Sequence, residues 1–392
     1  MVDARRLHGA ALAEALLESR ARTWSLVNDL TDAQWRMPEQ GGVNPLRWEL
    51  AHLAWFAEFW VLRGPHHRAA DGTARALHPA RHAGPDEHFD SARLAHAARW
   101  RTPMPSRGQL GEMLQGQLDA CLAALPGTDD DAANYFHRLA LFHEDMHAEA
   151  FVWLRATLGY AAPAGLALPP LPPLAQAAPV VVRGGTFQLG RRIDEAGFAF
   201  DNEGPARSVT LADFEIDAAP VSAGEFLRFV EAGGYDDPAH WPGAAGAWRA
   251  SSDKPHPQRW RFDAGSGWQT RWFDRWLPLA PALPVIHVNA FEAEAYCAWS
   301  KRRLPTAAEW ERAVTHMQWG HSVWEWTSDT FEPYPGFTPG PYREYSAPWF
   351  GDHRELRGGA FATHARMHDP RYRNFFQPQR SDVFAGFRSV AA

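Results

Sequence analysis

The sequence predicts two domains of different class: a four-helix bundle in residues 1–161 and a loop-rich domain with short strands in residues 180–392. Three observations support this division. The first part carries four long amphipathic helical patterns. A segment rich in proline and alanine, residues 162–179, is typical of a semi-rigid linker. Beyond it glycine, tryptophan and short runs of β-branched residues prevail, and clear helical patterns occur only near residues 221–232 and 290–300.

Each of the four helical patterns has a spacing suited to a bundle. Apolar residues recur at steps of three and four over about residues 6–29, 46–63, 107–125 and 131–159. Amphipathic helices of this length commonly bury their apolar faces against one another. The second and third are joined by a connection, residues 64–106, that is rich in His, Arg, Pro and Gly. A connection of that length more often has a function, such as binding a ligand, than serves only to join two helices.

The fourth helical pattern contains the pentapeptide His143-Glu144-Asp145-Met146-His147. Four residues of α-helix turn by about 400° and rise by about 6 Å, so both imidazoles can reach a single ion. His52, in an apolar stretch of the second pattern, is a third candidate, because an unpaired histidine there would carry a desolvation cost. Bundle cores commonly bind metals with side chains from facing helices. These three histidines are the predicted metal ligands.

Two other interpretations of the histidines stay open. A histidine on an inward helix face is commonly a hydrogen-bonded core residue. The pattern His143-Glu144-x-x-His147 is also the signature of zinc proteases, in which the glutamate is the general base. Such enzymes take a third ligand downstream, and no x-x-Gly-x-x-His follows His147. The protease is therefore the less favoured interpretation.

The composition favours a globular protein that acts on small molecules. The chain has 392 residues, 45% of them hydrophobic, which is ample for sizeable cores. A formal charge of −7 argues against nucleic acid or an anionic membrane as a main partner. The start of the chain lacks the apolar run of a signal peptide. No stretch comes close to the roughly 18 consecutive apolar residues that a membrane-spanning helix needs. Because Cys121 and Cys297 are the only cysteines, a reducing cytoplasm is expected.

Several phrases of the second half resemble one known domain. They are Arg183–Gly190, Arg303–Glu311, Val323–Thr327, Leu356–Gly359 and Gly386–Arg388. These phrases look like the formylglycine-generating, or sulfatase-modifying-factor, domain, and the resemblance implies a mixed α/β, C-type-lectin-like fold for residues 180–392. Formylglycine generation itself needs a reactive cysteine pair. Because this half has a single cysteine, which looks structural, that activity is not expected.

The first half resembles a DinB-type four-helix bundle, and the two halves together look like the sulfoxide synthases of ergothioneine biosynthesis (EgtB-like enzymes). Those enzymes hold ferrous iron with one histidine on the second helix and two in a His-x-x-x-His-x-Glu motif on the fourth. The resemblance implies Fe(II), dioxygen and hercynine, the trimethylammonium betaine of histidine. Glu149 and Glu144 are candidates for orienting a ligand imidazole, and Glu149 is favoured by the motif. The residues that match the family's motifs are His52, His143, His147 and Glu149.

The resemblance also implies a hercynine pocket in the second half. A quaternary ammonium favours aromatic rings, and a carboxylate needs amide donors. In the matching segment Arg373-Asn374-Phe375-Phe376, Asn374 would bind the carboxylate and Phe375 would face the cation. Tyr334 would lie nearby. The alternative is that Phe375 is an ordinary core residue.

Two positions depart from the branch of the family that uses γ-glutamylcysteine. Phe331 replaces a tyrosine thought to donate a proton, and Phe376 replaces an acidic residue. A pair of arginines for the dipeptide carboxylates has no secure match in residues 64–106. Residues 89–100 instead look like a segment of selenoneine synthases (SenA), which join hercynine to the selenosugar 1-seleno-N-acetylglucosamine. Candidate partners for the sugar hydroxyls are Asp86, His88, Asp90 and Ser91.

The sequence therefore predicts a cytoplasmic, non-heme Fe(II)- and O2-dependent selenoneine synthase that joins hercynine to a selenosugar by oxidative C–Se bond formation. The alternative within the class is a sulfoxide synthase that uses a thiol such as γ-glutamylcysteine or cysteine. Outside the class, a non-catalytic hercynine- or sugar-binding protein with structural zinc stays open. Neither nucleic acid nor a membrane is an expected partner.

Overall fold

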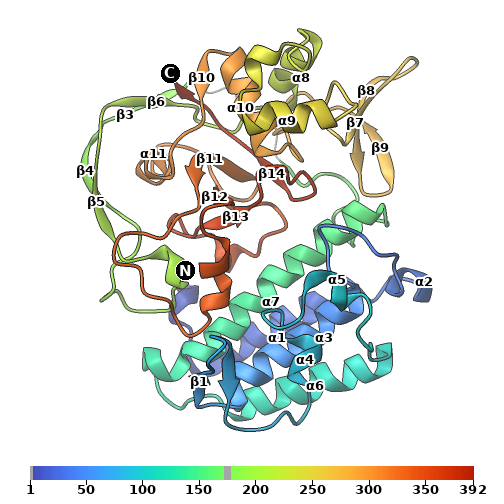
Figure 1. Cartoon of the computed structure of the whole chain (residues 1–392), viewed down its shortest axis with the longest axis vertical. Coiled ribbons are helices and arrows are strands. Elements are labelled where there is room, and N and C mark those ends of the chain that lie inside the picture. Colours follow the sequence, from blue (N-terminus) through green and yellow to red (C-terminus); the bar gives the residue numbers. More distant parts are fainter. Residues whose placement is uncertain (1–2, 172–177) are drawn as a thin grey trace. The chain divides into compact units, whose positions relative to one another are not determined.

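The computed structural model describes residues 3–171 and 178–392, so part of the expected linker, residues 172–177, lies outside the described residues. The chain divides into two compact units. Unit 1 comprises residues 1–164 with 196–199, and unit 2 comprises residues 165–195 with 200–392. Figure 1 shows a mainly helical first unit and a second unit of mixed strands and helices. Among the described residues, no helix has both the length and the apolar character needed to cross a bilayer.

Unit 1 is built on four long helices, as the sequence predicts. Helix α1 packs against α7, and α3 packs against both α6 and α7. A π-helical turn, η2, continues α3 without a break. The long helices are α1 (Gly9–Ser25), α3 (Leu46–Ala57) with η2 (Glu58–Leu62), α6 (Arg107–Ala123) and α7 (Asp131–Leu158). The short elements are η1 (Ala4–Arg6), α2 (Asp32–Trp35), β1 (His66–Arg68), β2 (Ala74–Ala76), α4 (Asp86–Phe89) and α5 (His96–Arg99).

The connection between η2 and α6 is anchored to the helix that precedes it. Glu58, fully buried in η2, accepts three backbone N–H bonds from residues 81–83 at 2.6–2.9 Å. Asp86 accepts the indole N–H of Trp55 and two guanidinium bonds from Arg63. Glu58 thus fixes residues 81–83 and the half-buried Asp86 fixes the start of α4, in a loop that has little regular structure of its own.

Unit 2 has the mixed α/β fold that the resemblance implies. One antiparallel sheet has the strand order β10-β15-β6-β3, and a second has the order β13-β12-β11-β14, in which the β11–β14 pair is parallel. The smaller sheets are β4-β5 and β7-β8-β9. The strands are β3 (Val180–Val182), β4 (Gly185–Leu189), β5 (Arg207–Leu211), β6 (Phe214–Ile216), β7 (Trp260–Asp263), β8 (Gly267–Trp272), β9 (Arg275–Pro278), β10 (Arg302–Arg303), β11 (Trp324–Thr330), β12 (Arg354–Gly358), β13 (Asn374–Phe376), β14 (Ala385–Gly386) and β15 (Val390–Ala391).

The helices of unit 2 are short, and several begin with a capping box. Ser222, Asn289 and Thr306 each accept a bond from the backbone N–H three residues later, where a glutamate side chain bonds back. The α-helices are α8 (Ala223–Glu231), α9 (Ala244–Ser251), α10 (Ala290–Trp299) and α11 (Ala307–Ala313). The 3₁₀ turns are η3 (Asp201–Glu203), η4 (Pro238–His240), η5 (Arg343–Tyr345), η6 (Ala347–Trp349) and η7 (Ala365–Met367).

Buried ion pairs occupy the centre of unit 2. Glu325 on β11 accepts bonds from the Nε and Nη2 atoms of Arg388 and from the indole N–H of Trp310, the last at 2.8 Å. Glu355 on β12 lies between Arg357 and Arg373, each within 2.7 Å of one of its oxygens. Trp310, Glu325, Arg357 and Arg388 belong to the phrases that carry the family resemblance. Those phrases therefore encode much of the charged core of the domain.

Glu292 on α10 makes the stability of the protein depend on pH. Its carboxyl group accepts the hydroxyl of Tyr235 at 2.6 Å and the backbone N–H of Asn289. Burial raises its pKa from 4.5 to about 7, although both hydrogen bonds oppose this shift. Because the folded protein holds this proton more tightly than the unfolded chain, stability is expected to fall by up to about 3 kcal/mol as the pH rises from 4.5 to 7. Glu292→Gln should flatten this part of a urea-unfolding profile.

The control is a glutamate with the opposite shift. Burial acts to raise the pKa of Glu309, but its bonds with Arg303 and Thr306 bring it below the ordinary value. This group is ionised in both states above pH 5, so Glu309→Gln should change the free energy of unfolding without changing its slope between pH 5 and 7. An unchanged slope in Glu292→Gln would contradict the assignment.

Candidate metal centre

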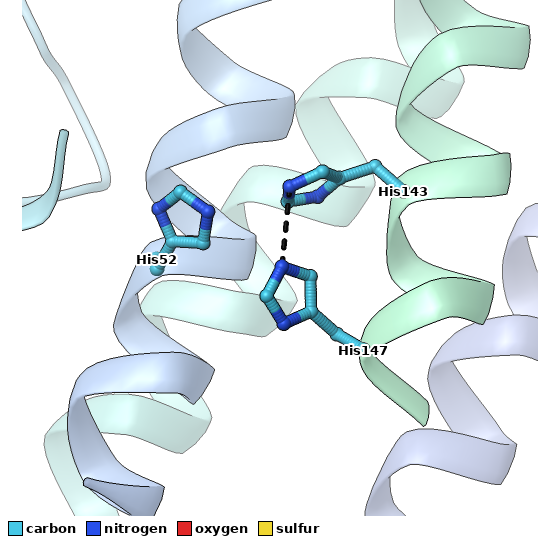
Figure 2. Close-up of side chains that lie close together, drawn as sticks. All are labelled: His52, His143 and His147. Atoms are coloured by element: carbon cyan, nitrogen blue, oxygen red, sulfur yellow. Dashed lines mark hydrogen bonds between the residues drawn. The ribbon is translucent and has the colours of Figure 1, made fainter. Parts of the chain in front are cut away.

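Three imidazoles meet in the core of the bundle. His52 comes from α3, whereas His143 and His147 lie one turn apart on α7. His52 and His143 are 2% and 3% exposed, and His147 is partly buried. One nitrogen from each ring lies within 4.8 Å of the others. Figure 2 shows the ring of His52 facing the two rings of α7 across a common space.

The spacing of the nitrogens fits a single metal ion. The Nε2 atoms of His143 and His147 are 3.2 Å apart. Two imidazole nitrogens that are each about 2.1 Å from one ion lie about 3.0–3.4 Å apart when the angle at the ion is about 90–110°. Three imidazoles without a carboxylate or thiolate suit a transition metal rather than magnesium or calcium. The donor set therefore fits iron or zinc.

Two of the three rings are fixed from behind by hydrogen bonds. The Nδ1–H of His52 donates to the main-chain carbonyl of Phe89 at 2.7 Å, and that of His147 donates to the carboxylate of Glu49 at 2.6 Å. In each ring the proton on Nδ1 leaves the lone pair on Nε2, the atom that faces the common space. The His143 ring lies flat on Phe56, with the ring centroids 3.5 Å apart.

The surroundings keep the rings of His52 and His143 neutral. Burial, followed by the neighbouring His147, lowers the pKa of His52 well below its ordinary value. The same two causes, in the same order, lower the pKa of His143. A neutral imidazole has a lone pair to offer, whereas an imidazolium has none. The two buried rings are thus in the form that binds metal ions.

Among the acidic residues near the triad, Glu49 was not predicted from the sequence. Its carboxylate bonds to a ligand ring although it lies on the other helix, 98 residues away from His147. A signal was present, because Glu49 is an acidic residue inside an apolar helical stretch, three residues before His52. Glu144 instead pairs with Arg20. Glu149 is buried, and its role stays a prediction.

The four candidate sugar partners lie in and just after α4. Asp86 is engaged by Arg63 and Trp55, as described above. Asp90 accepts the backbone N–H of Ala92, and the carbonyl of Ser91 accepts a bond from Arg99. The remaining candidate, His88, borders a pocket of about 600 Å³ together with Arg81, His82 and Glu112. Its role and those of the other three stay predictions.

In unit 2, the expected hercynine residues lie on β13 and around it. The ring of Phe375 stacks on that of Phe331, with the ring centroids 4.1 Å apart. The Oδ1 atom of Asn374 accepts the next backbone N–H at 2.9 Å. Phe376, at the end of β13, has the guanidinium of Arg380 over its ring. The strand thus presents an amide and an aromatic stack side by side.

Tyr334 lies in the charged core of unit 2. Its hydroxyl accepts a bond from Arg357 at 3.1 Å, and the guanidinium groups of Arg373 and Arg207 lie over its ring at 4.1 and 5.1 Å. Arg373 also lies 4.8 Å over the ring of Phe331. Tyr334 is therefore linked to the expected pocket through Arg373, and its direct contact with hercynine stays a prediction.

The two cysteines have the properties of core residues. Both are buried and neither forms a disulfide. Burial raises the pKa of the Cys121 thiol to about 12 and that of the Cys297 thiol still further. Because a thiolate rather than a thiol is the reactive form, neither residue has the character of a catalytic cysteine.

Two family models agree with this architecture. The DinB superfamily matches residues 15–157, and the sulfatase-modifying factor enzyme 1-like domain matches residues 168–322 and 316–392. The formylglycine-generating enzyme of Thermomonospora curvata is 34% identical over 37% of this chain and 52% of its own length. The solved structure of PvdO from Pseudomonas aeruginosa covers 54% of this chain and 93% of its own, at 18% identity and a TM-score of 0.37.

Full-length relatives share both domains. Hercynine oxygenase of Mycolicibacterium thermoresistibile is 34% identical over 97% of this chain and 94% of its own length. Hercynine oxygenase of Mycobacterium tuberculosis is 32% identical over 96% of this chain and 97% of its own. Similarity of this extent includes both the helix with the paired histidines and the charged core of unit 2. The chain belongs to the hercynine oxygenase family.

Proposed function

We propose that this protein is a non-heme Fe(II)- and O2-dependent hercynine oxygenase that joins hercynine to a thiol such as γ-glutamylcysteine or cysteine. The observation that carries the proposal is the buried triad His52, His143 and His147 in a chain that matches hercynine oxygenases over nearly its whole length. A non-catalytic protein with structural zinc would be expected to surround the ion with four protein ligands. The triad supplies three, which leaves room for substrates.

The residues around the triad have distinct tasks. A ferrous ion bound there would supply redox chemistry and open coordination positions for dioxygen and a soft sulfur or selenium donor. The Phe89 carbonyl and the Glu49 carboxylate orient two of the three ligand rings. Trp48 stacks on His52 and Phe56 on His143, so the outer faces of these rings are shielded from water. The chain would thus hold such an ion with three nitrogen donors, from His52, His143 and His147.

In the proposed hercynine pocket, Asn374 binds the carboxylate of the substrate and Phe375 contacts its trimethylammonium group. Because Oδ1 of Asn374 is engaged by the backbone, its NH2 end is the one that can donate to a carboxylate. The ring of Phe375 stacks on that of Phe331. The rings of Tyr345 and His353 are in T-shaped contact with it, and their centroids lie 5.6 and 5.9 Å from the centroid of Phe375. A trimethylammonium group is stabilised by such an aromatic surface.

Asn374→Ala is expected to raise the apparent KM for hercynine, because the carboxylate loses a charge-assisted bond worth about 1.5–3 kcal/mol. Phe375→Leu should weaken the binding of hercynine more than that of histidine, since only hercynine carries the trimethylammonium group. Steady-state kinetics with hercynine and binding measurements with both ligands test this. An equal loss for hercynine and histidine in Phe375→Leu would show that Phe375 does not contact the cation.

A selenosugar is the second candidate donor, and two side chains favour it. Phe331 and Phe376 stand where the branch that uses γ-glutamylcysteine is expected to carry a phenol and an acid. Phe331 is fully buried against Phe375, so this wall is hydrocarbon. A charged dipeptide would lose partners there, whereas a neutral sugar loses less. A selenolate, ionised near pH 7, also depends less on a proton donor.

A competition assay separates the three functions. The full chain is loaded anaerobically with Fe(II), and oxygen uptake is followed with hercynine and equimolar γ-glutamylcysteine, cysteine and 1-seleno-N-acetylglucosamine, with the products identified by mass spectrometry. A C–S product as the main product supports the thiol-dependent oxygenase. A selenosugar product formed well ahead of it would replace that assignment by selenoneine synthesis. No oxygen uptake with any donor, together with retained zinc, would contradict both.

A further inference from the structure

We propose that Glu49 is a positioning residue of the metal centre: its carboxylate fixes the ring of His147 and raises the affinity of the triad for a divalent ion. The inference deepens the proposed function and rests on it for the identity of the ion. It concerns a residue of the bundle core that belongs to neither the His-x-x-x-His-x-Glu motif nor the ligand set.

The position of Glu49 makes it a brace between the two ligand helices. Glu49 and His52 lie one turn apart on α3, so α3 supplies both a metal ligand and the hydrogen-bond acceptor for a ligand on α7. The Oε1–Nδ1 distance of 2.6 Å is typical of a charge-assisted hydrogen bond. The Glu49 side chain is only 2% exposed. The bond is therefore shielded from water. Hydrogen bonds are stronger in such a low-dielectric environment, so the effect of the carboxylate on the ring is large.

The partners of neighbouring carboxylates show that Glu49 differs from them. Glu144 pairs with Arg20, Glu58 caps three backbone amides, and Asp145 accepts a bond from Ser19. Within the described part of unit 1, the side chain of Glu49 bonds to His147 and is paired with no arginine or lysine. A buried carboxylate of this kind needs compensating positive charge. A divalent ion on the far nitrogen of the same ring supplies it.

The consequence for the ligand is both geometric and electronic. A carboxylate that accepts Nδ1–H holds the tautomer with the lone pair on Nε2 and makes that nitrogen a stronger donor. The carbonyl of Phe89 gives His52 the same orientation without the negative charge. Of these two rings, that of His147 is therefore the one whose hydrogen-bond acceptor, the Glu49 carboxylate, carries a negative charge. Outer partners of this kind typically change metal affinity about 10–100-fold.

The experiment is a Co(II) titration of the metal-free full-length protein, read by visible absorption and by competition with a chelator. Glu49→Gln keeps an acceptor for Nδ1–H but removes the charge, and Glu49→Leu removes both. The Kd for Co(II) is expected to rise in Glu49→Gln and to rise further in Glu49→Leu, within about 10–100-fold. Thermal unfolding of the metal-free variants reports whether the bundle remains folded.

Glu58→Gln is the matched control. Glu58 is a buried glutamate on the continuation of the same helix, and it bonds to main-chain N–H groups rather than to a ligand ring. This variant should lose stability but keep the Kd for Co(II). A lower melting temperature with an unchanged Kd in both Glu49 variants would assign Glu49 a purely structural role and overturn the proposal.

A spectroscopic measurement tests the same contact directly. In the Co(II)-loaded protein, the exchangeable Nδ1–H protons of the ligand rings give NMR signals displaced by the ion, and Glu49→Gln should move the signal of one ring while leaving that of His52 in place. No movement would also overturn the proposal. The His52→Ala variant distinguishes failure of the Glu49 proposal from failure of the proposed function. If this variant binds Co(II) as the wild type does, the metal centre and the proposed function fail together.

Discussion

Replacing His147 with alanine is expected to abolish turnover and to weaken iron binding. The affinity for iron should fall by more than the factor of about 10–100 that is typical for loss of a residue that only hydrogen-bonds to a ligand. The variant removes one of two nitrogens that lie 3.2 Å apart, and it leaves the buried Glu49 carboxylate without its donor. Two imidazoles on different helices then remain for the ion. Iron content after anaerobic loading, and oxygen uptake with hercynine and the donor, measure the two effects.

His137→Ala is the matched control for this variant. His137 is also a buried histidine of α7, but its Nε2 atom bonds to the carbonyl of Cys121 and it lies outside the triad. Its replacement should lower the free energy of unfolding while iron content and turnover are retained in the folded protein. If His147→Ala kept full activity, the triad would be refuted.

Replacing Arg388 with methionine is expected to destabilise the protein by about 3–5 kcal/mol, because it strands a buried carboxylate. Arg388 and Glu325 are both 0% exposed, and the guanidinium also donates to the main-chain carbonyls of Asp217 and Gln318. A methionine fills much of the same volume but offers no donor. Chemical denaturation, followed by tryptophan fluorescence, measures the loss.

The comparison variant for Arg388→Met is Arg192→Met. Arg192 pairs with Asp194 at the surface, where its side chain is 67% exposed. Exposed ion pairs contribute little to stability because water screens them, so the free energy of unfolding should hardly change. Equal effects of the two substitutions would show that the Glu325–Arg388 pair is not buried as described.

The long helices of the bundle could be predicted because their signal is local. Apolar residues at steps of three and four fix the buried face of α1, α3, α6 and α7 without reference to the rest of the chain. The short α11 was not predicted, although Thr306 and Glu309 form a capping box at its start. A helix of two turns carries too little periodicity to be recognised, and the capping residues were the available signal.

The metal ligands could be predicted in part for the same reason. His143 and His147 are neighbours on one helix, and His52 stood out in an apolar stretch. The bond from His147 to Glu49 spans 98 residues and depends on how two helices face each other. Spacing along the chain does not encode that orientation. Pairing across the fold was therefore the part that required three-dimensional structure.

The second unit shows the limit of inference from residue type. The family resemblance placed Tyr334 near the expected hercynine pocket, and the structure shows two arginines of the same domain over its ring. A sequence does not say which cations of its own domain an aromatic ring will meet. Contacts such as Glu325–Arg388, which join residues 63 positions apart, had to be observed.

The acceptor behind His52 is a peptide carbonyl, and this has a consequence for how the family can diversify. Any amino acid at position 89 presents the same oxygen, provided that the main chain keeps its course, and that course is fixed at the start of α4 by Asp86. The side chains of Glu87, His88 and Ser91, which are exposed or half-buried in this loop, can therefore be exchanged without removing the support of the ligand. The donor contacts proposed for this loop can therefore change while the geometry of the three histidines stays the same.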